Sequence, residues 1–285
     1  MELTQKTATE RYNTIRESKP GLLIQHIEQL ALTENGIGTE KVFDFFKQEV
    51  VPHLHAGAGP RYLGFVTGGS TPASMLGDFL TTIYDQNAFG YNDTAAPILE
   101  KQALSYLKEI LGISSSFFGT FVTGATQSNF VSLAIARQWC GKQKGINVAQ
   151  EGLSNLKIKI VGATPHASAY KSISMLGLGK QNIDVIDTLP EKERMDIDAL
   201  KKYLIKNQEH TIIVLASSGT VNTGDFDDLV EIAELKKQFN FWLHVDGAFG
   251  AFAACSPDRA HHMKGINEAD SITVDAHKWL NVPYD

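Results

Sequence analysis

Two side chains near the end of the sequence are suited to carbonyl chemistry. Asp246 closes the run Trp-Leu-His-Val-Asp, and Lys278 follows the run Ser-Ile-Thr-Val-Asp-Ala-His. Each run starts as a short apolar segment with the β-branched content of a buried strand. Parallel strands deliver the residues after them to one sheet edge, so both side chains are expected on the same rim. A carboxylate and an amine are costly to bury unpaired, which indicates a charged ligand between them. The alternative is a structural aspartate and a surface lysine.

A turn of small residues marks a second candidate site. The segment from Gly119 to Thr123 has the character of a short strand, and Gly124-Ala125-Thr126 lead into an apolar-periodic helix. Free backbone N–H groups and the helix dipole converge at such a point, which predicts an anion site. The turn has neither the dinucleotide G-x-G-x-x-G nor the P-loop G-K-[ST] spacing. The alternative is an ordinary N-cap by Thr123 or Thr126.

The strings HVDGAFG and DAHKW resemble the pyridoxal-phosphate-dependent group II amino-acid decarboxylases, the family of the glutamate, aromatic amino-acid and diaminobutyrate enzymes. The resemblance implies that Lys278 forms the Schiff base with the cofactor aldehyde and that Asp246 pairs with the protonated pyridine nitrogen. The chemistry needs an amine that reacts with carbonyls, and a carboxylate that keeps the ring cationic and able to accept electrons. Ala248, a small residue after the aspartate, would let the ring lie close to the strand.

Other cofactor contacts follow from the same resemblance. Gly124, Ala125 and Thr126 would hold the phosphate. His277 corresponds to a histidine beside that phosphate, and its alternative role is packing at a strand end.

Three further positions correspond to family residues near the cofactor. His166 follows the predicted strand at 158–161 and corresponds to a histidine that stacks on the pyridine face and can relay a proton; a lone histidine after a strand is otherwise more often structural. Thr220 corresponds to a position near the cofactor. Asp227 does too, although a helix N-cap explains it equally well.

The implied reaction is release of CO2 from an L-amino acid. Another pyridoxal-phosphate lyase or a desulfurase is the alternative within enzymes. A noncatalytic truncated homologue that packs as a dimerisation partner is the alternative from another class. A nicotinamide enzyme is disfavoured because no dinucleotide fingerprint follows any strand.

The substrate is not assigned by the sequence. Residues 51–72 are rich in Gly and Pro and read as an irregular loop, which lines the substrate pocket in the family. This loop lacks the family's His-Pro-aromatic string, and Arg61 is a candidate contact for a substrate carboxylate. His53 and His55 alternate like a metal pair, but no third ligand has suitable spacing nearby, so no metal site is predicted.

Strands and helices alternate from about Gly119 onward, which predicts an α/β fold with a mostly parallel, doubly wound sheet, as in the large domain of fold-type-I pyridoxal-phosphate enzymes. Apolar periodicity predicts helices within 22–30, 42–46 and 71–111, and the loop at 141–155 is expected to be a linker. The expected organisation is an N-terminal helical segment, residues 1–50, and a cofactor-binding large domain, residues 51–285.

Composition places further bounds. The chain has 285 residues, 43% of them hydrophobic, a net charge of −6 and two cysteines without metal-ligand spacing. Acidic charge argues against nucleic-acid or anionic-membrane surfaces. The N-terminus lacks the apolar core of a signal peptide, so a cytoplasmic protein is expected. Kinship implies a homodimer.

Lys278 lies seven residues before the end of the sequence. The family continues through a final strand, a mobile catalytic loop and a smaller C-terminal domain. The expectation is therefore a fragment or a truncated product without that small domain, with an exposed sheet edge.

Overall fold

A five-stranded parallel sheet organises the molecule. The computed structural model describes residues 2–21, 31–32, 34–86, 93–153 and 156–284. The strand order is β2-β1-β3-β4-β5, and every pairing is parallel. The strands are β1 (Ile158–Gly162), β2 (Ile183–Val185), β3 (Thr211–Ser217), β4 (Phe241–Asp246) and β5 (Ser271–Thr273). The predicted α/β class and parallel sheet are confirmed.

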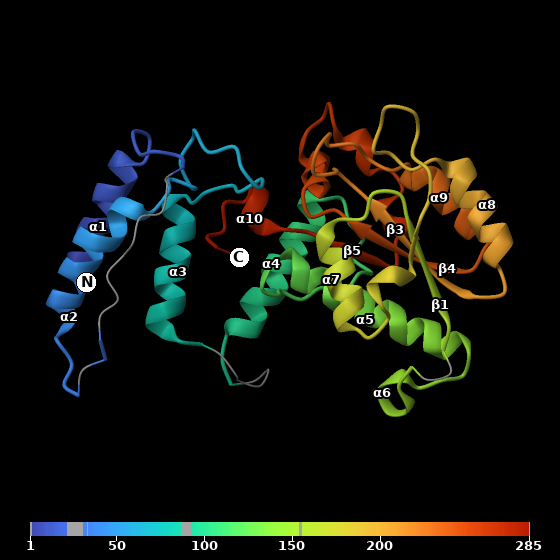
Figure 1. Ribbon diagram of the computed structural model, residues 1–285, viewed down its shortest axis with the longest axis horizontal. Helices are drawn as coiled ribbons and strands as arrows, with labels where there is room; N and C mark the ends of the chain where they lie inside the picture. The colour runs from blue at the N-terminus through green and yellow to red at the C-terminus, as the bar shows by residue number, and fades with distance from the viewer. Residues whose placement is uncertain (1, 22–30, 33, 87–92, 154–155, 285) are drawn as a thin grey trace.

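Helices cover both faces of this sheet, and alternate residues of each strand serve the two faces. In β3, Ile213 and Leu215 lie in one core with α5 (Gly124–Gln143) and α7 (Ala167–Met175). Ile212 and Val214 lie in the other core with α8 (Ile197–Asn207) and α9 (Leu229–Lys236). All four side chains are at most 5% exposed. Figure 1 shows the helices on the two sides of the strands, so the sheet is doubly wound as predicted.

The helices α8 and α9 each begin at an aspartate cap. Asp196 caps α8 by accepting hydrogen bonds from the N–H groups of Asp198 and Ala199. The cap of α9 is Asp228, which accepts from the N–H of Glu231. The N-cap interpretation of Asp227 is therefore wrong. Asp227 is 3% exposed, and its carboxylate instead accepts from the backbone N–H groups of Met195 and of Ser217 at the end of β3.

Three local predictions fail. Residues 119–122 form no strand, because a cavity separates them from β5 and an extended segment needs a ladder partner. The expected linker at 141–155 contains the short helix α6 (Val148–Glu151). The polar helix α1 (Glu2–Thr14) was not anticipated, since it has no apolar stripe to reveal it.

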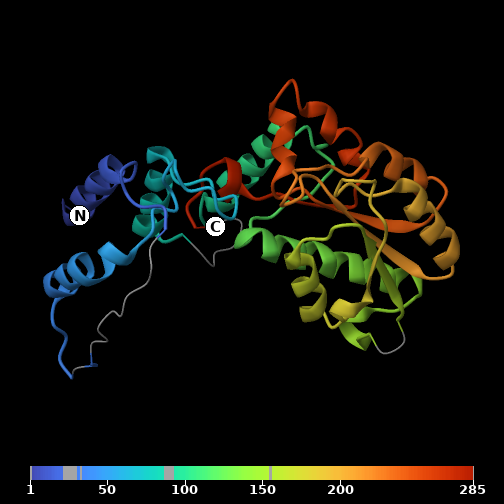
Figure 2. The ribbon, with the colours of Figure 1, turned by 45° about the horizontal axis from the view of Figure 1, so that its top comes forward.

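In the part of the chain that the structure describes, four α-helices precede α5, namely α1, α2 (Thr39–Phe45), α3 (Pro72–Tyr84) and α4 (Ala96–Ile110). Figures 1 and 2 show α1, α2 and α3 gathered at a distance from the sheet, with α10 (Ala276–Trp279) between them and it. The predicted helix at 42–46 is confirmed, as are two helices within 71–111. The helix expected at 22–30 lies outside the described residues.

Short helical turns complete the fold. Turns η1 (Phe46–Val50) and η2 (Val51–His53) continue directly from α2, so they run across the predicted domain boundary between residues 50 and 51. The remaining turns are η3 (Lys180–Asn182), η4 (Gly250–Cys255), η5 (Ala260–Met263) and η6 (Ile266–Glu268). Within the described ranges, every helix is too short or too polar to cross a bilayer.

A matched pair of substitutions tests this core. Ile213 at the centre of β3 is 0% exposed, whereas Ile205 on α8 is 51% exposed. We expect Ile213→Ala to lower the free energy of unfolding by about 2–5 kcal/mol, because it leaves a cavity. Ile205→Ala should change it by less than about 1 kcal/mol. Denaturant unfolding followed by circular dichroism measures both, and equal effects would contradict the assignment of β3 to the core.

Candidate active site

The candidate site lies along the carboxyl edge of the sheet. Asp246, the last residue of β4, is paired in register with Ser217 of β3 and Thr273 of β5. His166 follows β1 by four residues, so it belongs to the same edge. The chain leaves β1 toward β2 on one side, and β3 lies on the other, which makes this a topological switch point. Ligands of open α/β sheets bind in such crevices.

Asp246 is held by two donors. Its Oδ2 accepts a hydrogen bond of 2.9 Å from the side-chain amide of Asn129, and its Oδ1 accepts one of 3.2 Å from the backbone N–H of Ala248. Ala248 is buried, so the chain turns tightly beside the carboxylate. A carboxylate with two donors is oriented while it keeps lone pairs for a ligand.

Lys278 is not at a strand end, contrary to the sequence interpretation. It lies in α10, five residues beyond the last residue of β5. Its Nζ is 4.0 Å from Oδ2 of Asp275, and the two side chains are 20% and 11% exposed. Asp275 also caps α10 by accepting from the N–H of His277. The amine therefore faces a carboxylate that the sequence analysis did not select.

His166 has a structural role and an exposed ring at once. Its Nδ1 accepts a hydrogen bond from the N–H of Ser168 at 3.2 Å, which caps α7, and lies 2.8 Å from the Ser168 hydroxyl. Since a backbone N–H can only donate, Nδ1 must accept, and the neutral ring carries its proton on Nε2. The residue is exposed, so its ring is accessible to a ligand.

The N-terminus of α5 is left without a side-chain cap. Thr123 occupies the N-cap position, but its hydroxyl makes no capping hydrogen bond. Gly124 has φ +80°, and a Cβ there would meet nothing within 4 Å. The interpretation of Thr123 as an ordinary cap is therefore wrong. The Gly124 N–H donates to the carbonyl of Val122, while no side chain caps the N–H groups of Ala125 and Thr126 in the first turn of this 20-residue helix. This arrangement suits a phosphate.

Thr220 and His277 have partners within the protein. The Thr220 hydroxyl lies 3.0 Å from that of Thr223 and accepts from the N–H of Asp225 at 3.1 Å. Glu193 braces the same loop, and hydrogen bonds from Thr220, Asn222 and Thr223 lower the pKa of its carboxyl to about 2. His277 donates from Nδ1 to the carbonyl of Val282 at 2.9 Å.

The glycine-rich loop at 51–72 docks on the lysine segment. Gly68 N–H donates to the carbonyl of His277, and the Asn281 side chain donates to the carbonyl of Gly68. Farther along, Arg61 donates to the carbonyl of Ser18 at 2.7 Å, so it ties the loop to the segment after α1. His55 stacks on Tyr62. Among the residues with assigned positions, no group of three or more metal-ligating side chains gathers.

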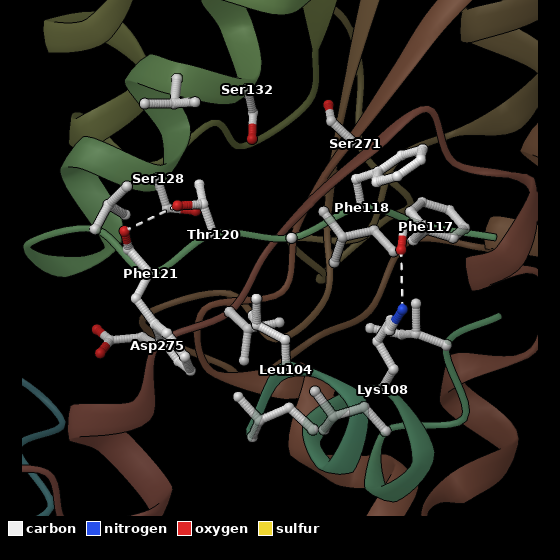
Figure 3. A pocket seen from close by; sticks show the side chains of 18 of the residues that line it. Leu104, Lys108, Phe117, Phe118, Thr120, Phe121, Ser128, Ser132, Ser271 and Asp275 are labelled. Atoms are coloured by element: carbon white, nitrogen blue, oxygen red, sulfur yellow. Dashed lines mark hydrogen bonds between the residues drawn. The ribbon is translucent and has the colours of Figure 1, made fainter. Parts of the chain in front are cut away.

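A largely apolar cavity of about 490 Å³ adjoins the site without containing it. It runs between α4, residues 111–122, α5 and β5, as Figure 3 shows. At one end it reaches Gly124, Ala125 and Asp275, while Asp246, His166 and Lys278 are not among its lining residues. Lys108 spans another part of the wall by donating to the carbonyl of Phe117. The polar chemistry is therefore at the sheet edge and the apolar volume is beside it.

His244, Asn129 and Ser168 were missed as site residues. His244 is 1% exposed within β4, and its ring nitrogens lie 2.9 Å from the Asn129 side-chain oxygen and 2.9 Å from the Ser271 hydroxyl. Burial lowers the pKa of His244 to about 4, opposed by the negative charge of Asp246. A polar residue inside an apolar strand was the available signal, because buried polar groups need partners.

The loop contact yields one prediction. A Cβ at Gly68 would press on the backbone oxygens of His277 and Lys278, whereas one at Gly77 in α3 would meet nothing within 4 Å. We expect Gly68→Ala to cost about 1–3 kcal/mol of stability and to speed proteolysis of residues 57–70. Gly77→Ala, on an exposed helix, should be neutral or stabilising by up to about 1 kcal/mol. Identical cleavage rates for the two variants would contradict this docking.

His244 gives a prediction about pH. Its pKa is about 4 in the folded protein against an ordinary 6.5, so below pH 6.5 the unfolded chain takes up a proton that the folded chain does not. Its contribution to stability is complete above pH 6.5 and is lost as the pH falls toward 4, by about 3 kcal/mol at most.

The measurement is the difference in unfolding free energy between wild type and His244→Gln across pH 4–7. The difference removes the contribution of Asp227, whose pKa burial raises to about 6 and whose effect has the opposite sign. The unfolding free energy of the wild type minus that of His244→Gln should increase as the pH rises from 4 to 7. A difference that does not change with pH would contradict the low pKa of His244.

Comparison with known proteins agrees with this geometry. Residues 20–285 match the family model described as the pyridoxal-dependent decarboxylase conserved domain. Aromatic-L-amino-acid decarboxylase of Bacillus atrophaeus is 30% identical over 259 residues, which cover 90% of this chain and 52% of that protein. L-2,4-diaminobutyrate decarboxylase of Acinetobacter baumannii is 29% identical over 221 residues, covering 72% of this chain and 43% of that protein.

The fold has the same relatives. The crystal structure of mouse CSAD in its apo form matches with a TM-score of 0.79 and 27% identity, over 89% of this chain and 53% of that chain. The chain thus spans about half the length of the proteins it matches. Since the family model covers nearly the whole sequence, this protein belongs to the pyridoxal-dependent decarboxylase family.

Proposed function

We propose that this chain carries the cofactor-binding part of a pyridoxal-phosphate-dependent decarboxylase that releases CO2 from an L-amino acid. The main support is the arrangement at one sheet edge. The uncapped N-terminus of α5, the oriented carboxylate of Asp246 and the exposed ring of His166 lie there, and Lys278 is on the segment that follows β5. Membership of the decarboxylase family supports the reaction.

The residues present fit the cofactor group by group. The N–H groups of Ala125 and Thr126 can receive the phosphate, since no side chain caps them, and Gly124, whose own N–H donates to Val122, leaves open space beside them. His277, one residue before Lys278, is proposed to lie beside this phosphate. Its Nδ1 donates to Val282, which leaves Nε2 of the neutral ring as an acceptor for the phosphate's proton or a water.

The ring contacts come from the other strand ends. Asp246 is proposed to pair with the pyridine nitrogen, Ala248 to let the ring approach, and His166 to stack on its face. Thr220, which is 8% exposed, would contribute through its position in the loop after β3. When bound, the cofactor supplies an electron-accepting ring that stabilises the negative charge left on the substrate's α-carbon after CO2 departs.

Lys278 is proposed to hold the cofactor aldehyde through Nζ. Its ion-pair distance of 4.0 Å to Asp275 is loose, so the amine can turn toward a carbonyl without losing a tight salt bridge. Asp275 can accept the proton that the amine gives up on reacting, because its carboxylate is already the amine's neighbour. His166 presents Nε2–H, which can donate a proton or a hydrogen bond to a bound group.

We infer a homodimer as the working assembly. Many large apolar side chains on α3 and α4 are exposed, and neither helix has a buried residue. Those with the greatest exposure are Leu76, Ile83, Tyr84, Ile98, Leu99 and Tyr106. Exposed apolar surface of this extent marks an interaction face. The division at residue 50, a cytoplasmic location and a substrate-carboxylate role for Arg61 stay predictions, and Arg61 would have to leave Ser18 to fill that role.

Covalent capture tests the proposed function. Wild-type chain incubated with pyridoxal phosphate and reduced with borohydride should carry the pyridoxyl group on the peptide containing Lys278, as found by mass spectrometry. Lys278→Ala should carry none at that peptide. Lys264→Ala, which removes an exposed lysine between η5 and η6, should label as the wild type does.

Amino acids are then screened for CO2 release. A folded wild type that labels at Lys278 and releases CO2 supports the decarboxylase, and other products would favour another lyase or a desulfurase. A folded chain that takes up no cofactor would contradict the proposal and favour the alternative of a noncatalytic homologue, which should sediment with a family partner.

A further inference from the structure

A network of hydrogen-bonded side chains, most of them buried, runs beneath the proposed cofactor site. It starts in the middle of the sheet and ends at the exposed ring of His166, and each link is 2.8–2.9 Å long. The members are Trp242, Ser271, His244, Asn129, Asp246, Ser168 and His166. Asn129 is its branching point, and it is 0% exposed in the second turn of α5.

The direction of the hydrogen bonds in this network is determined from the Asp246 end. The carboxylate of Asp246 can only accept, so Asn129 turns its side-chain nitrogen to it and its oxygen to Nε2 of His244, which must donate. The neutral imidazole then accepts at Nδ1 from Ser271 Oγ, which itself accepts the indole N–H of Trp242. The Asn129 amide is thereby fixed with its oxygen toward His244 and its nitrogen on the opposite side.

Both hydrogens of that nitrogen are used at the site. One is donated to Oδ2 of Asp246 and the other to Oγ of Ser168, each at 2.9 Å. Because Ser168 Oγ accepts from Asn129, its own hydrogen is free to point to Nδ1 of His166 at 2.8 Å. The Asn129 amide therefore donates directly to the Asp246 carboxylate and is linked to the His166 imidazole through the Ser168 hydroxyl.

We propose that Asn129 is a positioning residue that aligns Asp246 with the cofactor's ring nitrogen and His166 with the ring face, and that His244 and Ser271 hold Asn129 in the required orientation. This inference rests on the proposed function. The low pKa of His244 agrees with it, since a neutral imidazole is the form that accepts from Ser271 and donates to Asn129.

Binding of two ligands distinguishes a positioning role of Asn129 from a role in the stability of the protein alone. Pyridoxal phosphate has a ring nitrogen for Asp246 to meet, and its 1-deaza analogue does not. We expect Asn129→Ala to weaken binding of pyridoxal phosphate about tenfold or more while weakening the deaza analogue much less, because the hydrogen bond to a charged group is what is lost. Dissociation constants come from absorbance titration of the full chain.

Matched variants separate the two branches of the network, from Asn129 to Asp246 and from Asn129 through Ser168 to His166. Ser168→Ala removes only the hydroxyl that links Asn129 to His166. It should therefore change the ring-nitrogen chemical shifts of His166 in 15N NMR and leave the preference between the two ligands as in wild type. Asn207→Ala removes another buried asparagine, on α8, whose side chain donates to the carbonyl of Tyr203. It should leave that preference unchanged as well. Asn129→Thr, which can donate one hydrogen, replaces Asn129→Ala if the latter does not fold.

The outcomes are distinguishable. Equal weakening of both ligands by Asn129→Ala, or no more weakening than Asn207→Ala produces, would overturn the positioning role. A folded wild type that binds neither ligand would overturn the proposed function, and the positioning role with it. The NMR spectrum of the free chain checks the network separately, since His244 and His166 should both carry their proton on Nε2.

Discussion

Satisfying the carboxylate of Asp246 constrains the rest of the structure. A carboxylate at the end of a buried strand needs donors, and here they are the Asn129 amide and the Ala248 N–H. The first requires α5 to lie across β4 and β5, and the second requires a tight turn of small residues after β4. The position of α5 on the sheet and the turn after Asp246 thus both supply donors to one half-buried carboxylate.

Helix α5 combines two functions because of where it begins. Its uncapped first turn presents N–H groups at the carboxyl edge of the sheet, and its second turn places Asn129 under the same edge. The helix is anchored by contacts with α7, β4 and β5. The proposed phosphate site and the support for a neighbouring carboxylate are therefore built on one helix, which keeps the distance between them fixed.

The segment carrying Lys278 is held from the opposite side. Gly68 approaches the backbone of His277 and Lys278 so closely that no side chain fits between them. Asp275 caps α10 and is also the ion-pair neighbour of the lysine. The backbone of the lysine segment is thus located by contacts with a distant loop, while the lysine amine lies 4.0 Å from the Asp275 carboxylate. The exposed apolar side chains of α3 and α4 form the surface proposed to contact a second subunit.

Local patterns in the sequence were sufficient to predict the fold class and the family. Strand and helix periodicity predicted the parallel sheet and most of its helices, and the motifs around Asp246 and Lys278 indicated the family. What failed depended on distant contacts. Residues 119–122 have strand character but lie across a cavity from β5, and α1 has no apolar stripe. His244 was present in a quoted motif, yet its role depends on Asn129, 115 residues away. Periodicity reports which face of an element is apolar, and only the folded chain decides which polar groups share a buried hydrogen bond.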